Sequence, residues 1–311
     1  MKRLLPFFLA CLASPLFAQD YKYRFTLRDD NDFYFAGADR YYTNGTFFGL
    51  SWAARQKKPG EKGIWNIEFG QKMYNPQSGF IPDPKYIDRP FAAYLYLGAA
   101  HTKIYADESR LRVSLQGGVI GPDALGKEMQ SFIHRLIGQY PPRGWAYQIG
   151  NQVAVNAQAD YSRLLVRSQS NTIDISAEGS GLLGTTFSGA TAGLLFRAGA
   201  LKSFEKSSSY GADVGNGSSE RELFFYTRPQ AGWVAYDATL EGLPFGNNAS
   251  NSVTVAPNRF YYSQSFGFVY AKNRWLVDFS MLLRTREAPT QVRTVHWGML
   301  SLGYRFGKSA Q

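Results

Sequence analysis

Cysteine is almost absent from this sequence. The 311 residues contain a single one, Cys11, so disulfide scaffolds and zinc–thiolate sites are excluded, as is cysteine catalysis in the rest of the chain. Charged residues are few, at 19%, and the mean hydropathy is −0.29. After residue 18 no stretch approaches the roughly 20 consecutive apolar residues that a membrane-spanning helix needs, which excludes a helical membrane protein.

Residues 1–18 are expected to be a signal peptide that is removed on export. Lys2 and Arg3 form a positive start, residues 4–16 an apolar core, and Leu16-Phe17-Ala18 a cleavage site. Residues 19–311 then form one mature domain.

Positive charge dominates the chain. The net charge is +10, and loss of Lys2 and Arg3 with the signal peptide lowers it to +8. Because an exported protein rarely meets nucleic acid, we expect no nucleic-acid partner. Anionic lipid, especially phosphorylated glycolipid, fits the charge better. The alternative is that the charges are spread over loops and serve solubility.

Alternation with a period of two is the main pattern in the mature chain. In 110–116, Leu111, Val113 and Leu115 share one face, and residues 300–306 alternate in the same way. A soluble β-sandwich would also alternate. Here, however, many segments run for about ten residues with aromatic side chains near their ends, as in the girdles of a transmembrane barrel. These aromatic residues are Trp65, Tyr74, Tyr94, Tyr105, Tyr147, Trp233, Tyr236, Trp275 and Trp297.

The pattern predicts an all-β fold, an antiparallel transmembrane barrel of about twelve strands with no second domain. The strands are expected near 22–28, 43–54, 64–74, 92–104, 109–120, 147–158, 161–177, 186–198, 222–238, 259–272, 274–286 and 294–306. An even number places both termini on the periplasmic side of the bacterial outer membrane. Tight turns at Asp107-Glu108 and Lys272-Asn273 alternate with longer polar connections such as 205–221. The aromatic last strand, ending at Phe306, is the signal that the outer-membrane assembly machinery recognises, and we expect a monomer.

Segment 123–138 breaks this pattern and predicts a helix. Asp123 lies at or near its cap, and Gly138 and Pro141-Pro142 end it. We expect its apolar stripe to pack onto the barrel rim and so to hold His134 rigidly at the barrel mouth. The stripe consists of Leu125, Met129, Phe132, Ile133, Leu136 and Ile137.

Two segments contain the residue types that chemistry needs. His134 is a candidate general base, whereas His101 and His296 lie near strand ends and are expected to be structural. Segment 29–45, DDNDFYFAGADRYYTNG, concentrates oxygen ligands that suit a hard cation such as calcium, although Asp/Asn-rich turns are common for backbone reasons. No GxSxG motif is present.

These two segments together resemble the outer-membrane lipid A 3′-O-deacylases. DDNDFYFAGADRYYTNG matches the family's N-D…D-R-Y-Y-T-N-G motif. GVIGPDALGKEMQSFIHRLIG…PRGW matches its G-P-x-x-x-G-x-x-x-Q-x-x-x-H-x-x-x-G…G-W motif. The resemblance extends over the whole chain and implies calcium-dependent hydrolysis that removes the 3′-linked acyloxyacyl group from lipid A of lipopolysaccharide in the outer leaflet.

Carried over by position, the resemblance implies that His134 is the catalytic histidine. Asn31 and Asp32 fall on the paired polar residues and Thr43 on the threonine that opens the second strand. His134 would activate water, Asp32 would bind the cation or orient His134, and Asn31 and Thr43 would position water or the oxyanion. Tyr140 stands where some members have a carboxylate. By charge and location alone, the candidates for binding lipid A phosphates are Lys85, Arg89, Arg135 and Arg143.

Three alternatives remain at this stage. An outer-membrane phospholipase would need a serine nucleophile bonded to His134, and the sequence offers no convincing one. A non-catalytic lipopolysaccharide-binding barrel or a narrow porin would be consistent with the strands. A soluble β-sandwich explains neither the aromatic girdles nor the last strand.

Overall fold

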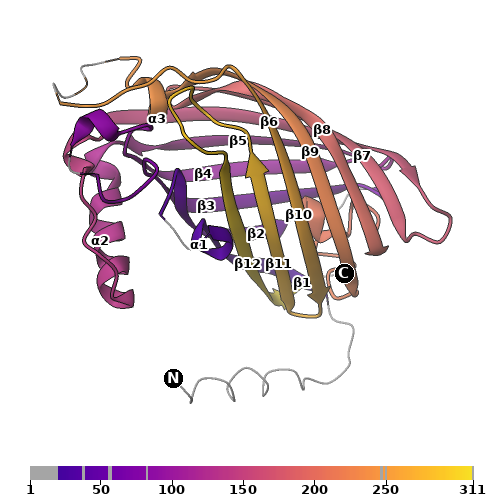
Figure 1. Ribbon diagram of the computed structural model, residues 1–311. Helices are drawn as coiled ribbons and strands as arrows, with labels where there is room; N and C mark the ends of the chain where they lie inside the picture. Colours follow the sequence, from indigo (N-terminus) through magenta and orange to yellow (C-terminus); the bar gives the residue numbers. More distant parts are fainter. Residues whose placement is uncertain are drawn as a thin grey trace.

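The computed structural model describes residues 20–36, 39–54, 58–81, 83–245, 248 and 251–309. The predicted signal peptide, 1–18, lies outside these residues. Twelve antiparallel strands form a closed barrel in which each strand pairs with the next and β1 pairs with β12, as predicted (Figure 1). The strands are β1 (Tyr21–Asn31), β2 (Tyr42–Ala53), β3 (Lys62–Tyr74), β4 (Ala92–Ile104), β5 (Ser109–Ile120), β6 (Gln152–Arg167), β7 (Ile173–Gly184), β8 (Phe187–Ala200), β9 (Glu222–Asp237), β10 (Phe260–Lys272), β11 (Trp275–Arg284) and β12 (Val295–Lys308).

The alternating strands place their apolar side chains outside and their polar side chains inside. Leu111, Val113 and Leu115 of β5 are exposed, whereas Asp174 and Ser176 of β7 are buried. This inside-out arrangement is that of a barrel surrounded by lipid, and it excludes a soluble sandwich. Among the described residues, no helix has the length and apolar character to cross a membrane.

The boundary between β6 and β7 differs from the prediction. The sequence pattern placed strands at 147–158 and 161–177, but β6 continues to Arg167 and the turn lies at 168–172. There the Ser168 hydroxyl accepts from the backbone N–H groups of Thr172 and Ile173, and Asn171 adopts a left-handed φ of 53°. Serine and asparagine support such turns, so this segment turns and 159–160 does not.

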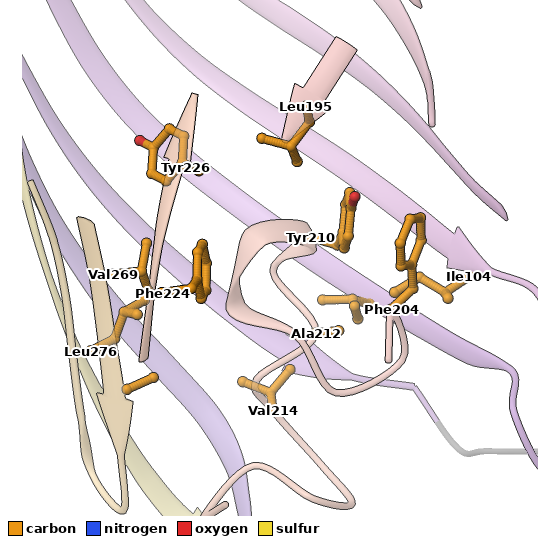
Figure 2. Packing of buried hydrophobic residues seen from close by; sticks show 12 residues of the cluster. Ile104, Leu195, Phe204, Tyr210, Ala212, Val214, Phe224, Tyr226, Val269 and Leu276 are labelled. Carbon is orange, nitrogen blue, oxygen red and sulfur yellow. The ribbon is translucent and has the colours of Figure 1, made fainter. Parts of the chain in front are cut away.

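Residues 201–221, which we call the plug, pack into the end of the barrel where β1 begins and β12 ends. The sequence predicted a long polar connection for 205–221, which is most of this segment. Instead Phe204, Tyr210, Ala212 and Val214 are fully buried. Figure 2 shows these side chains packed against residues from several strands of the wall. The wall residues labelled there are Ile104, Leu195, Phe224, Tyr226, Val269 and Leu276.

Buried ion pairs bind the plug to the seam where the barrel closes. Asp213 contacts Arg24 of β1 and accepts from Arg305 Nη2 of β12 at 2.8 Å. Gly215 donates its backbone N–H to the carbonyl of Tyr21 at 2.7 Å. One segment therefore joins the first and last strands.

Candidate active site at the extracellular rim

Helix α2 (Gly126–Ile137) lies at the end of the barrel away from the C-terminus (Figure 1). A 3-10 turn, Pro122–Ala124, precedes it, and Leu125 separates the two with a left-handed φ of 59°. The helix therefore begins three residues after Asp123, which was expected near its cap.

The outer face of the wall supports α2. A Cβ atom on Gly126 would lie 2.5 Å from the Ala93 side chain and 2.6 Å from the Trp145 ring, so only glycine permits this approach. Ala93 has the same parity along β4 as the exposed Leu97 and thus points outward. Gln71 Nε2 donates to the Ala124 carbonyl at 2.6 Å and anchors the entry to the helix.

The prediction that the apolar stripe of α2 packs onto the rim was wrong. The buried residues of α2 are Gly126, Gln130 and His134, one turn apart on one face. Small and polar residues occupy this face because the backbone approaches the wall closely and polar loop groups lie beside it. The stripe points away from the protein. Its exposed members are Leu125, Met129, Phe132, Leu136 and Ile137, and Ile133 is half-buried.

His134 is held by two partners from different loops. Its Nδ1 lies 2.5 Å from the Tyr140 carbonyl oxygen, which can only accept, so Nδ1 carries a hydrogen. Its Nε2 lies 2.9 Å from Asp39 Oδ2. The Tyr140 hydroxyl donates to the same carboxylate oxygen at 2.9 Å. The imidazole is therefore fixed in its orientation.

Asp39 supplies a carboxylate to His134, although it was not among the predicted catalytic residues. Tyr140, at the position where the resemblance led us to look for an acid, contributes its backbone carbonyl and its hydroxyl instead. Burial and the neighbouring negative charge of Asp39 raise the pKa of the Tyr140 phenol, which keeps the hydroxyl protonated as a donor. Asp39 belongs to the Asp-Arg-Tyr-Tyr motif, but nothing in the sequence gives its distance in space from His134, which follows 95 positions later.

Asp32 lies in the same loop as Asp39 and is almost fully buried. Its Oδ2 accepts from the Arg40 backbone N–H, and its Oδ1 has no hydrogen-bond partner among the described residues. Burial raises the pKa of Asp32 to about 8, and the negative charge of Asp39 adds to the shift. Thr43, also buried, donates to Asp39 Oδ1 at 3.4 Å.

The oxygen donors of this loop fit a hard cation. Carboxylate and hydroxyl oxygens are the ligands that calcium prefers, and a cation would compensate the buried Asp32 Oδ1. Asp32, Asp39 and Thr43 could provide part of a ligand set. In the part of the chain that the structure describes, no group of three or more His, Cys, Asp or Glu residues is arranged to hold a metal. Water or substrate oxygens would complete the set.

Thr43 bonds to Asp39, which contacts His134, and Asp32 lies in the same loop as Asp39. Asn31 makes a different contact. Asn31 Oδ1 accepts from the Phe33 backbone N–H at 2.8 Å and so begins the short helix α1 (Phe33–Ala36). The side chain therefore stabilises the turn that leads into the loop.

The four candidate phosphate-binding residues differ in their surroundings. Arg89 is fully buried. It donates to Glu287 at 2.9 Å and to the hydroxyl of Thr239, which lies in the short helix α3 (Ala238–Glu241). Lys85 is exposed beside Asp83. Arg143 lies over the Phe80 ring, and Arg135 is exposed on α2.

Two buried amides lie beside His134 and were not predicted. Gln130 Oε1 accepts from Trp145 Nε1 at 2.7 Å, but its Nε2 has no partner among the described residues, and neither amide atom of Asn75 has one. A Cβ atom on Gly79 would lie 3.0 Å from Tyr140 Oη, 3.1 Å from Gln130 Nε2 and 3.3 Å from Asn75 Nδ2. These polar groups therefore pack around one glycine.

Comparison with known proteins shows the family of the chain. A family model described as "Outer membrane protein LpxR" matches residues 5–306. The chain belongs to the LpxR family. This membership, with the closed barrel, places the protein in the outer membrane and supports modification of lipid A as its general activity.

The solved structure of LpxR from Salmonella typhimurium shares the fold. It is 21% identical, with a TM-score of 0.75 over 91% of this chain and 100% of that one. The β domain of the Bordetella autotransporter BrkA is 10% identical, with a TM-score of 0.48 over 92% and 100% of the two chains. Comparison with curated proteins gave no match.

Proposed function

We propose that this LpxR-family protein is a lipid A 3′-O-deacylase, a carboxylic ester hydrolase that releases the 3′-linked acyloxyacyl group in the outer leaflet. The observation that supports it best is the position of His134. The histidine lies on the outer face of the wall, where lipid is, and its Nε2 faces a carboxylate beside buried oxygen ligands.

In the proposed mechanism His134 is the general base. The Tyr140 carbonyl holds the hydrogen on Nδ1, so Nε2 is the nitrogen that can accept a proton. In the structure Nε2 contacts Asp39 Oδ2 directly at 2.9 Å, so the attacking water must take the place of this carboxylate oxygen on Nε2. The water then gives its proton to Nε2 as it attacks the ester carbonyl. Asp39 then stabilises the imidazolium, and His134 returns the proton to the leaving 3′ oxygen.

Asp32, with Thr43 and Asp39, would hold calcium. When bound there, the ion supplies positive charge that stabilises the oxyanion. Stabilisation of this kind is worth about 3 kcal/mol per donor. The buried, unpaired Asp32 Oδ1 supports this role because ionisation is unfavourable there without a cation.

The alternatives fit these contacts less well. A phospholipase with a serine nucleophile would need a serine hydroxyl bonded to His134, but the partners of this imidazole among the described residues are a carbonyl and a carboxylate. A porin needs an open lumen, whereas the plug packs four fully buried apolar residues into one end of the barrel.

Mass spectrometry of lipid A from outer membranes tests the proposal. Membranes with the unaltered protein and calcium should lose the mass of the 3′ acyloxyacyl group, and those with His134→Ala or with chelator should not. His101→Ala is the matched control, because His101 packs against Trp65 in the barrel wall. Unchanged lipid A despite a correctly inserted, heat-modifiable barrel would refute the deacylase assignment.

A further inference from the structure

Helix α2 exposes an apolar face that the fold does not cover. Leu125, Met129, Phe132 and Leu136 form this face, and between 38% and 69% of each residue's surface is exposed. These positions recur at three- and four-residue spacing, so they lie on one side of the helix. The side chains that contact the protein are those of Gln130 and His134, about a third of a turn away.

The position of α2 along the wall shows what adjoins this face. Gln71 of β3 bonds Ala124, two residues before the helix, and the next outward residues of that strand are the exposed Phe69 and Ile67. At about 3.3 Å per residue, Phe69 lies only about 7 Å from Gln71 along the strand. The helix therefore begins where the lipid-facing band of the barrel ends, at the depth of the boundary between headgroups and acyl chains.

The rest of the exposed surface of α2 is charged. Lys127 lies opposite the apolar face and forms what we call the basic face, and Arg135 lies about a quarter of a turn from the apolar face, beside the exposed Glu128. An apolar side together with charged residues in which basic ones are in excess is the pattern of a helix that lies in a membrane interface and faces anionic headgroups.

We infer that α2 is an interfacial helix whose apolar face is immersed in the acyl chains of the phosphorylated glycolipid of the outer leaflet. The apolar face adjoins the lipid-facing band of the barrel, so we expect it to contact acyl chains. The positive charges of Lys127 and Arg135 favour a lipid with phosphate groups. Immersion fixes the depth of α2 in the leaflet, and with it the depth of His134. The inference rests on the outer-membrane location and the geometry of α2 and does not require the chain to be a hydrolase.

Site-specific fluorescence of the reconstituted full-length protein tests this contact. In a Cys11→Ser background, Leu136→Cys and Phe132→Cys are labelled with an environment-sensitive dye, and Lys127→Cys on the basic face is the matched control. Each variant is reconstituted in vesicles of lipopolysaccharide with phospholipid and in vesicles of phospholipid alone, and heat-modifiable migration confirms folding.

In lipopolysaccharide vesicles, the labels at 132 and 136 should emit at shorter wavelength and be quenched by iodide several-fold less than the label at 127. Equal iodide quenching at all three positions would overturn the inference, since the apolar face would then lie in water. Equal protection at 132 and 136 in phospholipid alone would overturn the assignment to glycolipid. Because the readout is not activity, a failure of the proposed hydrolase function would leave this result unchanged.

Discussion

The two ends of the barrel differ in how completely their buried polar side chains are paired. At the plug, Asp213 is paired with two arginines, and the Arg197 guanidinium donates to both oxygens of Asp174 at 2.9 and 2.6 Å. Among the described residues of the plug, no buried side-chain polar atom lacks a partner. At the opposite rim, Asp32 Oδ1, Gln130 Nε2 and both amide atoms of Asn75 have none in the same described set.

This difference separates a stabilising end from a functional one. An unpaired buried polar group costs roughly 1–3 kcal/mol of stability, so a cluster of them persists only where something else requires it. The rim cluster surrounds His134 and the loop that fits a cation. Substitutions at the plug should therefore lower stability, and substitutions at the rim should lower activity.

The largest expected effect is that of Asp213→Ala on stability. Removing this carboxylate leaves Arg24 and Arg305 as uncompensated buried charges, a change that costs about 3–5 kcal/mol. Urea unfolding followed by heat-modifiable migration measures it. Lys206→Ala, which removes only the exposed pair with Glu220, should cost at most about 1 kcal/mol. Equal losses in the two variants would contradict a special role for the buried ion pairs of the plug.

Asp39→Asn should act on turnover and leave stability almost unchanged. The amide cannot stabilise an imidazolium as a carboxylate does, and we expect a loss of about 10- to 100-fold in kcat with little change in KM. Asp83→Asn, in an exposed pair with Lys85, is the control. A change confined to KM would show that Asp39 binds substrate and does not act through His134.

Calcium binding should depend on pH through Asp32. Burial raises the pKa of this carboxyl to about 8, so below that pH a cation must displace a proton. Calorimetry between about pH 6 and 9 should show affinity that rises about tenfold per pH unit up to about 8 and then levels. Without calcium, stability should fall as pH rises from about 4 toward 8, because the unfolded chain ionises more readily. Affinity that does not vary with pH would exclude Asp32 as a ligand.

Gly79→Ala should have the smallest effect. The new methyl group would press on the Tyr140 hydroxyl and the two buried amides, displacing Tyr140 and, through it, Asp39. Activity should fall a few-fold, by about 1 kcal/mol or less in barrier height. Gly117→Ala meets no atom within 4 Å and should be neutral. Equal activity in both variants would show that the packing around Gly79 does not position His134.

The sequence predicted the barrel because strand alternation is a local signal. It did not predict the orientation of α2, since an apolar stripe is equally visible whether it faces protein or lipid. The pairing of Asp39 with His134 and the burial of the plug also escaped prediction, because both depend on loops that meet only after the barrel closes. The prediction for Arg89 rested on charge alone, and its ion pair with Glu287 joins residues far apart in the chain.

The most direct test of the account is hydrolysis of purified lipid A by the purified protein in ¹⁸O-labelled water. If His134 activates water at the ester carbonyl, the released acid should carry the label in its carboxyl group and the 3′ hydroxyl of lipid A should not. The His134→Ala variant should release no acid. An unlabelled acid, transfer of the acyl group to another lipid, or no release at all in the presence of calcium would contradict the proposed mechanism.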